Sequence, residues 1–221
     1  MTKIPKIIHQ IWLGNKTRPD LWMNNIQEFC KHFNYEYVLW TEEKLKSFDI
    51  INLDKFNDAV IYAQKADILR YEILYSYGGI YIDADCVIVK PEKFNDLVES
   101  FTDDCILGRE AQEHEWKGGL IANTVIFSSP KSDFMDKCIK ELPHRNLKIE
   151  PWLSTGPQLV TDVNVKFPGL IQVLPKTILY PRKTNWQGIT DINMFKSFEY
   201  PEESLMFHHG YTTNELEKYI K

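Results

Sequence analysis

The stretch ADILRYEILYSYGGIYIDAD, residues 66–85, decides the fold of this chain. Its first part continues a run in which apolar residues recur at helical spacing, which predicts a helix over residues 59–77. Gly78 and Gly79 should end that helix, because glycine readily adopts the left-handed conformation that helix ends need. The apolar run IYI that follows, residues 80–82, indicates a short strand that leads into two aspartates.

Strand-like and helix-like segments alternate on both sides of this stretch. Residues 6–12 read as a buried strand, residues 20–33 as a helix that follows a proline, and residues 35–40 as a second strand. This order is typical of the start of a parallel nucleotide-binding sheet, so we expect an α/β fold with a mostly parallel central sheet flanked by helices. Further strands are expected at residues 86–90, 105–107, 124–128, 171–174 and 205–208, and further helices at 133–141, 157–163 and 214–220.

The composition suits one compact domain that covers residues 1–221. The chain has 221 residues, of which 43% are hydrophobic, enough for one ordinary core. It carries 26 Lys and Arg against 31 Asp and Glu, a net charge of −5, whereas nucleic-acid binders normally have a basic surplus. Nucleic acid is therefore not expected among its partners.

The N-terminal residues show no charged region, apolar stretch and cleavage site in series. No stretch approaches the ~20 apolar residues that a membrane span requires. We therefore expect a soluble, cytoplasmic protein. No structural zinc site is expected, because none of the four cysteines lies in a CxxC or a Cys/His ligand spacing.

Asp83 and Asp85 are candidates for a metal site. They are two apart at the end of an apolar strand, and strand geometry would place both side chains on one side, where they can face one cation. A hard divalent cation prefers such oxygen ligands and keeps open positions for substrate phosphates. The alternative is a polar turn after a strand, but the two glycines, the strand and Tyr81 that accompany the pair favour a metal site.

Asp67 and Arg70 are three residues apart on the expected helix and so share a face. A carboxylate can bind sugar hydroxyls, and a guanidinium can bind phosphate oxygens and hold that carboxylate in place. By spacing alone, an exposed and weakly stabilising salt bridge is the simpler interpretation.

These motifs resemble a known family. Residues 4–14 (IPKIIHQIWLG), residues 66–85 and the later STGP at 154–157 are similar, in order, to the DxD-containing glycosyltransferases. That family includes capsular-polysaccharide transferases, fungal initiating mannosyltransferases, viral glycosyltransferases and, more distantly, the glucosylating clostridial toxins. The resemblance implies a GT-A fold, a nucleotide-sugar donor, Mn²⁺ or Mg²⁺ as cofactor, and sugar transfer with retention of configuration. It also implies a nucleotide-binding half at 1–90, which includes the DxD motif, and an acceptor-side half with a C-terminal closing segment at 91–221.

The resemblance assigns the residues around the nucleobase. Trp12 matches the tryptophan that packs against the base, beside backbone contacts from Gln10, Ile11 and Leu13. Without the family, Trp12 would be interpreted as a core residue, because strand aromatics usually pack. Asn123 stands where the family often has a polar residue beside the donor or acceptor, although a turn leading into a strand is an equal alternative.

The donor and metal residues are assigned in the same way. Asp67 and Arg70 match the pair that contacts the donor sugar and its phosphate, and Tyr81 and Ala84 lie at the donor. Asp83 matches a carboxylate near the ribose and the metal, and Asp85 matches the direct metal ligand. The catalytic residues that the resemblance implies are Asp67, Arg70, Asp83 and Asp85.

A third metal ligand is expected from the segment MFHHGYTT, residues 206–213. Many enzymes of the family have there a histidine followed by a Ser-Trp pair. His208 is favoured over His209, because Thr213 then stands at the serine position, although Asn214 replaces the tryptophan. A pair of solvent-exposed histidines is the alternative. Thr155, Gly156 and Pro157 are expected to form a turn and a helix start on the acceptor side.

The predicted function is metal-dependent transfer of a hexose-type sugar to a glycan or glycoconjugate hydroxyl, with UDP preferred over GDP as the carrier. Any membrane contact would come through the acceptor. No carboxylate can be named as a nucleophile, so attack on the face that the leaving group vacates is favoured. A nucleotide-sugar hydrolase or pyrophosphorylase, or a non-catalytic nucleotide-sugar-binding domain, would use the same residues and stays as an alternative.

Overall fold

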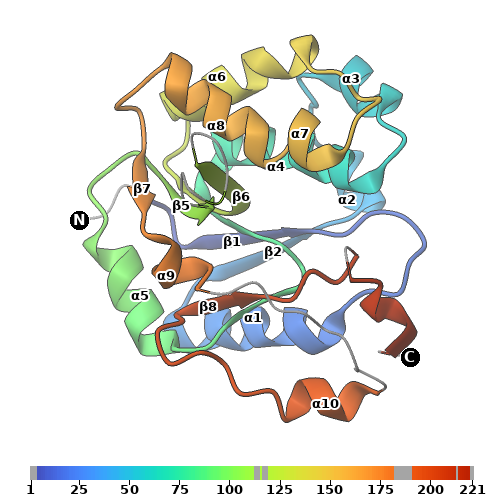
Figure 1. Cartoon of the computed structure of the whole chain (residues 1–221). Helices are drawn as coiled ribbons and strands as arrows, with labels where there is room; N and C mark the ends of the chain where they lie inside the picture. The colour runs from blue at the N-terminus through green and yellow to red at the C-terminus, as the bar shows by residue number, and fades with distance from the viewer. Residues whose placement is uncertain (1–3, 112–114, 116–118, 182–190, 213, 220–221) are drawn as a thin grey trace.

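A six-stranded sheet with the strand order β2-β1-β3-β6-β5-β7 forms the centre of the fold (Figure 1). The structure is a computed structural model that describes residues 4–111, 115, 119–181, 191–212 and 214–219. The strands are β1 (Ile7–Ile11), β2 (Glu36–Trp40), β3 (Gly79–Ile82), β5 (Cys105–Ala111), β6 (Leu120–Ser128) and β7 (Gln172–Leu174).

The sheet is mostly parallel, as expected, and β6 is the strand that runs against the others. β1 pairs in parallel with β2 and with β3, and β5 pairs in parallel with β7. β6 is antiparallel to both β3 and β5. The connection between β5 and β6 is too short for the crossover that parallel neighbours need, so these two strands pair as a hairpin.

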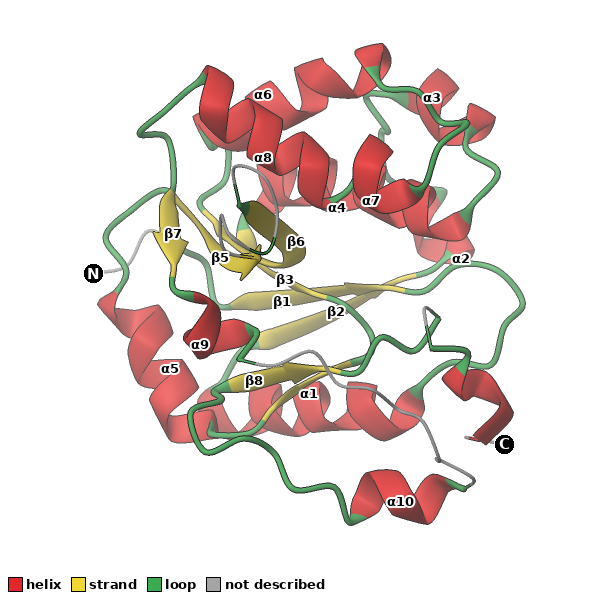
Figure 2. Ribbon diagram, in the orientation of Figure 1, coloured by secondary structure: helices red, strands yellow, loops and turns green. Residues whose placement is uncertain are grey.

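Helices cover both faces of the sheet (Figures 1 and 2). One face carries α1 (Asp20–Phe33), α5 (Pro91–Ser100), α9 (Lys176–Leu179) and α10 (Ile192–Lys196). The other carries α2 (Glu42–Leu45), α3 (Leu53–Asp58), α4 (Tyr62–Tyr77), α6 (Asp133–Glu141), α7 (Pro151–Ser154) and α8 (Pro157–Lys166). Two short 3₁₀ helices are η1 (Leu142–His144) and η2 (Leu216–Tyr219). Within the described residues, no helix has both the length and the apolar character needed to cross a bilayer.

A separate two-stranded ribbon joins distant parts of the chain. β4 (Cys86–Ile88) pairs with β8 (Met206–His208) in antiparallel register, with Cys86 opposite His208. The ribbon lies between the main sheet and α1 (Figure 2). It therefore brings the segment after residue 205 to the end of the turn that holds the acidic pair.

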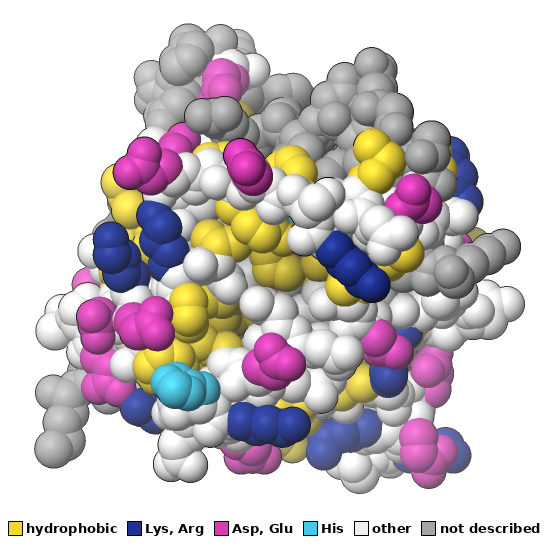
Figure 3. Space-filling view, turned by 90° about the horizontal axis from the view of Figure 1, so that it is seen from below, with side chains coloured by type: hydrophobic (Ala, Val, Ile, Leu, Met, Phe, Trp, Pro, Cys, Tyr) yellow, Lys and Arg dark blue, Asp and Glu magenta, His cyan; other side chains and the backbone are white. Residues whose placement is uncertain are grey.

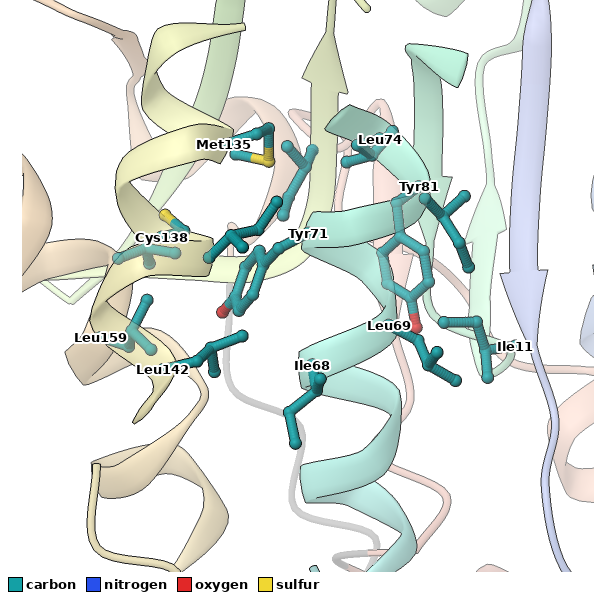
Figure 4. Packing of buried hydrophobic residues seen from close by; sticks show 14 of the residues in the cluster. Ile11, Ile68, Leu69, Tyr71, Leu74, Tyr81, Met135, Cys138, Leu142 and Leu159 are labelled. Carbon is teal, nitrogen blue, oxygen red and sulfur yellow. The ribbon is translucent and has the colours of Figure 1, made fainter. Parts of the chain in front are cut away.

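Helix α4 is buried on most of its circumference. Figure 4 shows Tyr71 pointing toward Cys138 and Leu142, whereas Leu69 lies beside Tyr81 on the side of the sheet. Even its polar residues are buried, namely Gln64, Asp67, Arg70 and Glu72. The expected helix over 59–77 begins later, at Tyr62, because Ala59 is extended and ends α3. It is also less amphipathic than its pattern suggested, since its polar side is buried too.

The double glycine after α4 allows the chain to turn tightly into β3. Gly78 and Gly79 have φ values of 66° and 98°, in the region that side chains disfavour. A Cβ on Gly79 would lie 2.6 Å from the carbonyl oxygen of Ile7. The double glycine therefore ends the helix as expected, and Gly79 also lets the backbone of β3 come close to that of β1, with which it pairs.

Several expected elements differ in their ends. β6 begins before residue 124, and β4 is shorter than residues 86–90, because Pro91 begins helix α5 instead of only closing the strand. The helix expected at 214–220 is, within the described residues, the 3₁₀ helix η2. The helix at 133–141 has the expected bounds, and the one at 157–163 continues to Lys166.

Candidate active site

The candidate site lies at the carboxyl ends of β1 and β3. β1 stands between β2 and β3, and the chain covers one face with α1 on its way to β2 and the other face with α4 on its way to β3. This is a topological switch point, and open α/β sheets bind ligands in the crevice outside it. Trp12 and Leu13 follow β1, and Asp83 follows β3, so both loops meet at this edge.

Arg70 forms the centre of a buried ionic cluster. Its Nη2 lies 3.0 Å from Asp67 Oδ1 and 3.2 Å from Asp83 Oδ1. The side chains of Arg70 and Asp67 are only 5% and 7% exposed, so the interpretation as a surface salt bridge is wrong. Burial lowers the pKa of Arg70, but the carboxylates of Asp83 and Asp67 raise it more, and the guanidinium is charged.

Tyr81 links this cluster to the sheet. Its hydroxyl donates to Asp83 Oδ1 at 2.7 Å, and the Arg70 guanidinium lies over its ring, 4.3 Å from the centroid. A cation over an aromatic face is stabilised by the ring's negative face. The tyrosine thus holds Asp83 and Arg70 in one arrangement, although its own side chain is buried.

Asp67 receives hydrogen bonds at both carboxylate oxygens. Asn123 Nδ2 donates to Oδ1 at 2.8 Å, and Thr155 Oγ1 donates to Oδ2 at 2.7 Å. The carbonyl oxygen of Asn123 also accepts from Arg70 Nη1 at 2.6 Å. Burial raises the pKa of Asp67, while Arg70 and these two donors oppose the rise.

Asp85 faces a different partner from Asp83. Its Oδ1 lies 3.3 Å from His208 Nε2, and its Oδ2 accepts from the backbone N–H of Tyr211 at 2.5 Å. Desolvation lowers the pKa of His208, but the Asp85 carboxylate outweighs it and raises the pKa to about 9. The Asp85 carboxylate and the His208 ring are therefore paired with each other in the structure.

The two aspartates do not share a face as expected. β3 ends at Ile82, so residues 83–85 form a turn, and the alternation of a strand does not apply to them. Within the described residues, the possible ligand atoms that lie within 4.8 Å of one another belong to Asp85, Cys86 and His208. Asp83 is directed instead to Arg70 and Tyr81.

The side chains at this turn include a carboxylate and an imidazole that could hold a divalent cation. The carboxylate of Asp85 and the imidazole of His208 are both groups that can bind a divalent cation, whereas the Cys86 thiol is buried in the core. The Asp85 side chain is mostly buried at 12% exposure, whereas the His208 side chain is 35% exposed. The structure thus brings together the histidine and the second aspartate that were predicted as ligands.

His209 is not an alternative ligand in this arrangement. Its ring is buried and stacks on Trp22, with ring centroids 4.5 Å apart. Tyr200 also lies within hydrogen-bond distance of its Nε2. Neither histidine is therefore a freely exposed residue of a surface pair. Thr213, which supported the choice of His208, lies outside the described residues.

The residues after β1 line the edge of the site. Gln10 is buried and its Nε2 donates to the carbonyl oxygen of Asp83 at 3.1 Å, which ties β1 to the acidic turn. Ile11 and Leu13 are buried apolar residues, as is Ala84 between the two aspartates. Their side chains pack in the protein, so any contact they make with a donor would come from the backbone.

Trp12 is half-buried at the same edge. Its backbone N–H donates to the carbonyl oxygen of Trp40, and its ring centroid lies 5.9 Å from that of Tyr211. A hollow next to Tyr211 is lined by Lys16, Tyr211, Thr212 and Glu215, among others. Trp12 thus combines packing with a position at the rim of the site.

A second hollow lies on the opposite side of the ribbon. Figure 3 shows apolar side chains gathered in the middle of the underside of the molecule, between charged ones. The hollow between α1, β4 and α10 is lined mainly by apolar and aromatic residues, including Leu21, Trp22, Val87, Phe195 and Phe198.

Two residues make contacts at the site that the sequence did not predict. Tyr211 gives its backbone N–H to Asp85, and its ring packs between Trp12 and Trp22. Thr155 belongs to the quoted STGP motif, but it is fully buried against Asp67 rather than lining an open acceptor side. Only the motif itself could have drawn attention to Thr155.

The sequence of the chain is similar to those of known glycosyltransferases. The family described as "Glycosyltransferase sugar-binding region containing DXD motif" matches residues 19–102. Inositol phosphoceramide mannosyltransferase 3 of Schizosaccharomyces pombe is 43% identical over 88 residues, which cover 37% of this chain and 24% of the relative. Mannosyl phosphorylinositol ceramide synthase CSH1 of Saccharomyces cerevisiae is 34% identical over 171 residues, 72% of this chain and 42% of the relative.

The chain therefore spans less than half the length of these two relatives. Among solved structures, the PaToxG glycosyltransferase has a TM-score of 0.58 and 20% identity, covering 75% of this chain and 71% of that one. A likeness at this identity concerns the fold alone. The expected GT-A fold, with a central sheet flanked by helices, is confirmed.

Proposed function

We propose that this chain is a DxD-containing glycosyltransferase that transfers a sugar from a nucleoside-diphosphate sugar to a glycoconjugate hydroxyl. The finer proposal is a hexose-type sugar, UDP as the preferred carrier rather than GDP, and retention of anomeric configuration. The fungal relatives are named for mannosyl transfer to inositol phosphoceramide, which supports a glycoconjugate acceptor class.

One observation carries the proposal. A buried, charged cluster of Asp67, Arg70 and Asp83 lies beside the Asp85–His208 pair at the edge where β1 and β3 end. Burying ionised groups is costly unless they are paired, and such clusters often mark functional sites. A cluster with both a cation and several carboxylates suits a donor that carries a charged diphosphate and a hydroxyl-rich sugar.

Each residue has a chemical role in this proposal. Arg70 faces the phosphate oxygens with a fixed fork of donors, while Asp67 accepts hydrogen bonds from sugar hydroxyls. Trp12 offers an aromatic face to the base, which fits its half-buried position at the rim. Gln10, Tyr81, Ala84 and Asn123 hold the turn and the cluster around the donor.

Asp85 and His208 would hold the divalent cation, Mn²⁺ or Mg²⁺, with Asp83 near the ribose. When bound, the cation supplies positive charge that stabilises the diphosphate as it leaves. The bond between the anomeric carbon and the phosphate oxygen breaks, and the acceptor oxygen bonds to the same carbon. The acceptor proton passes to an oxygen of the departing diphosphate, so no carboxylate nucleophile is required for retention.

A donor screen tests the proposal directly. Thermal unfolding would be followed with Mn²⁺ and a panel of UDP- and GDP-sugars, because a ligand that binds the native state raises the unfolding temperature. The best donor would then be incubated with glycolipid and oligosaccharide acceptors, and the products separated by mass. We expect sugar attached to an acceptor and free nucleoside diphosphate.

The alternatives give different products. A nucleotide-sugar hydrolase would release free sugar with or without acceptor, and a pyrophosphorylase would release sugar phosphate. A non-catalytic binding domain would show the thermal shift without turnover. No shift with any nucleotide sugar would reject the whole proposal.

A further inference from the structure

The STGP segment, residues 154–157, packs against the polar side of helix α4. From this contact we propose that Thr155 is a positioning residue that fixes the carboxylate of Asp67 in the orientation needed by the donor sugar. The inference rests on the proposed function, in which Asp67 contacts the sugar.

Thr155 is held at both its side chain and its backbone. Its Oγ1 donates to Asp67 Oδ2 at 2.7 Å, and its carbonyl oxygen accepts from the hydroxyl of Tyr71 at 2.7 Å. The residue is fully buried, so water cannot replace either hydrogen bond. A hydrogen bond to an ionised group is about twice as strong as one between neutral groups.

The spacing of the partners on α4 matches the segment. Gln64, Asp67 and Tyr71 are three and four residues apart, which places them along one face of a helix. Gln64 Nε2 donates to Ser154 Oγ at 3.1 Å, one turn before the contacts of Thr155. Successive turns of α4 therefore hold successive residues of the segment, and the register between them is fixed.

Gly156 brings the segment close enough for these contacts. A Cβ at this position would lie 3.1 Å from the carbonyl oxygen of Pro151 and 3.3 Å from Asp67 Oδ2. A larger residue would therefore press on the same carboxylate oxygen that Thr155 binds. Pro157 then begins helix α8, which fixes the direction in which the chain leaves.

Three donors of the protein use the acceptor positions of the Asp67 carboxylate. An ionised carboxylate has roughly four acceptor positions. Arg70 and Asn123 approach Oδ1, and Thr155 approaches Oδ2, so three donors of the protein are in place. Under the proposed function, a sugar hydroxyl would use the remaining position, and its direction is set by the three donors already bound.

Thr155 has a distinct part in this arrangement. Arg70 and Asn123 both bind Oδ1, so the hydroxyl of Thr155 is what restrains the other oxygen. Without it, the carboxylate would be held at Oδ1 alone, and its rotation about the Cβ–Cγ bond would be less restrained. A group that is oriented before the ligand arrives loses less freedom on binding and therefore binds more tightly.

The test compares Thr155→Val, Thr155→Ser and Thr161→Val with the wild-type chain. Valine keeps the volume of threonine and removes the hydroxyl, whereas serine keeps the hydroxyl. Thr161 is the matched control, because its buried hydroxyl accepts from the backbone of Ile121 and donates to that of Pro157, with no contact to Asp67.

The probes are UDP-glucose, UDP-galactose and GDP-mannose, each titrated with Mn²⁺ against the corresponding free nucleoside diphosphate. The quantity compared is the ratio of nucleotide-sugar affinity to nucleotide affinity, which reports on the sugar alone. For Thr155→Val we expect this ratio to fall by about 10- to 100-fold, the scale of a hydrogen bond to a charged group. Thr155→Ser and Thr161→Val should keep it, although Thr161→Val lowers the unfolding temperature.

An unchanged ratio in a folded Thr155→Val protein would overturn the inference, and so would an equal fall in Thr161→Val. If Thr155→Val does not fold, Tyr71→Phe replaces it, because this change releases the Thr155 carbonyl and one partner of Asn123. The ratio should fall in that variant too, and an unchanged ratio would reject the inference. Failure of the wild-type chain to bind any of the three nucleotide sugars would instead reject the proposed function.

Discussion

The ring of His209 stacks on that of Trp22 at 4.5 Å and an angle of 18°. Its neighbour His208 points the other way, toward Asp85. Adjacent residues at the end of a strand face opposite sides, so one histidine belongs to the apolar cluster under the ribbon and the other to the acidic turn. The two histidines should therefore respond differently to mutation.

We expect His208→Ala to weaken Mn²⁺ binding by at least about ten-fold while the fold stays intact, because a ligand is lost at the surface of the turn. His209→Ala should instead lower the free energy of unfolding by about 2 kcal/mol or more, as removal of a packed ring does. Calorimetric Mn²⁺ titration and urea unfolding of both variants check this. The reverse pattern would make His209 the ligand.

Asp85→Asn should abolish turnover and the Mn²⁺-dependent thermal shift without unfolding the protein. The amide oxygen can still accept from the backbone N–H of Tyr211, but it offers the cation no negative charge. Circular dichroism and an activity assay measure the two effects, and Asp103→Asn on the exposed surface is the control. Wild-type turnover in excess chelator would contradict the metal assignment.

Trp12→Ala should weaken nucleoside-diphosphate binding by ~1–3 kcal/mol, the scale of stacking on a base. Trp12→Phe should retain most of the affinity, because it keeps an aromatic face beside Tyr211. Calorimetry with UDP and GDP measures both, with the exposed Trp152→Ala as a control. Equal affinities in all three variants would leave Trp12 with a packing role only.

Arg70→Met should lower the free energy of unfolding by about 3–5 kcal/mol, since it leaves the carboxylates of Asp67 and Asp83 without their cation in a buried site. Arg70→Lys keeps the charge but not the fork of donors, and should cost less stability while still impairing donor binding. Urea unfolding gives the comparison. If Arg70→Met is as stable as wild type, the two carboxylates do not need the cation, which would show that water reaches the cluster.

Stability should fall as the pH falls below neutrality, because of His9. Desolvation lowers the pKa of this buried ring to about 4 from its usual 6.5, and its Nε2 is bonded to the carbonyl oxygen of Gly78. Between these two pKa values the unfolded chain binds a proton that the folded chain does not. The histidine should therefore reduce the free energy of unfolding by about 2 kcal/mol between pH 7.5 and pH 5.

Urea unfolding at the two pH values measures this loss, and His9→Gln should make the curve flatter over that range. The exposed His32→Gln is the matched control and should keep the wild-type slope. An identical pH dependence in His9→Gln and wild type would show that other groups account for it.

Periodicity and turn residues predicted the first half of the fold well. The segments around β1, α1 and β2 have clear local patterns, and the double glycine marks the end of α4 as expected. The local pattern of β6 did not predict that this strand runs antiparallel to β5. The direction in which two strands pair depends on the connection between them, not on either strand alone.

The candidate site was harder to predict in its contacts than in its residues. Asp85 and His208 meet as expected from the family, but the shared face of Asp83 and Asp85 was wrong, since a turn begins after Ile82. The burial of Asp67 depends on Asn123 and Thr155, which are 56 and 88 positions away in the chain. The sequence of helix α4 alone cannot predict contacts with residues so far away in the chain.

The β4–β8 ribbon also sets an order of assembly. Asp85 and Tyr211 are 126 positions apart, yet they are hydrogen-bonded across this ribbon. During synthesis, the donor-side helix and strand leave the ribosome long before the strand that completes their neighbour. Under the proposed assignment of Asp85 and His208 as cation ligands, a nascent chain would carry its carboxylates without the imidazole until the second strand of the ribbon has been synthesised.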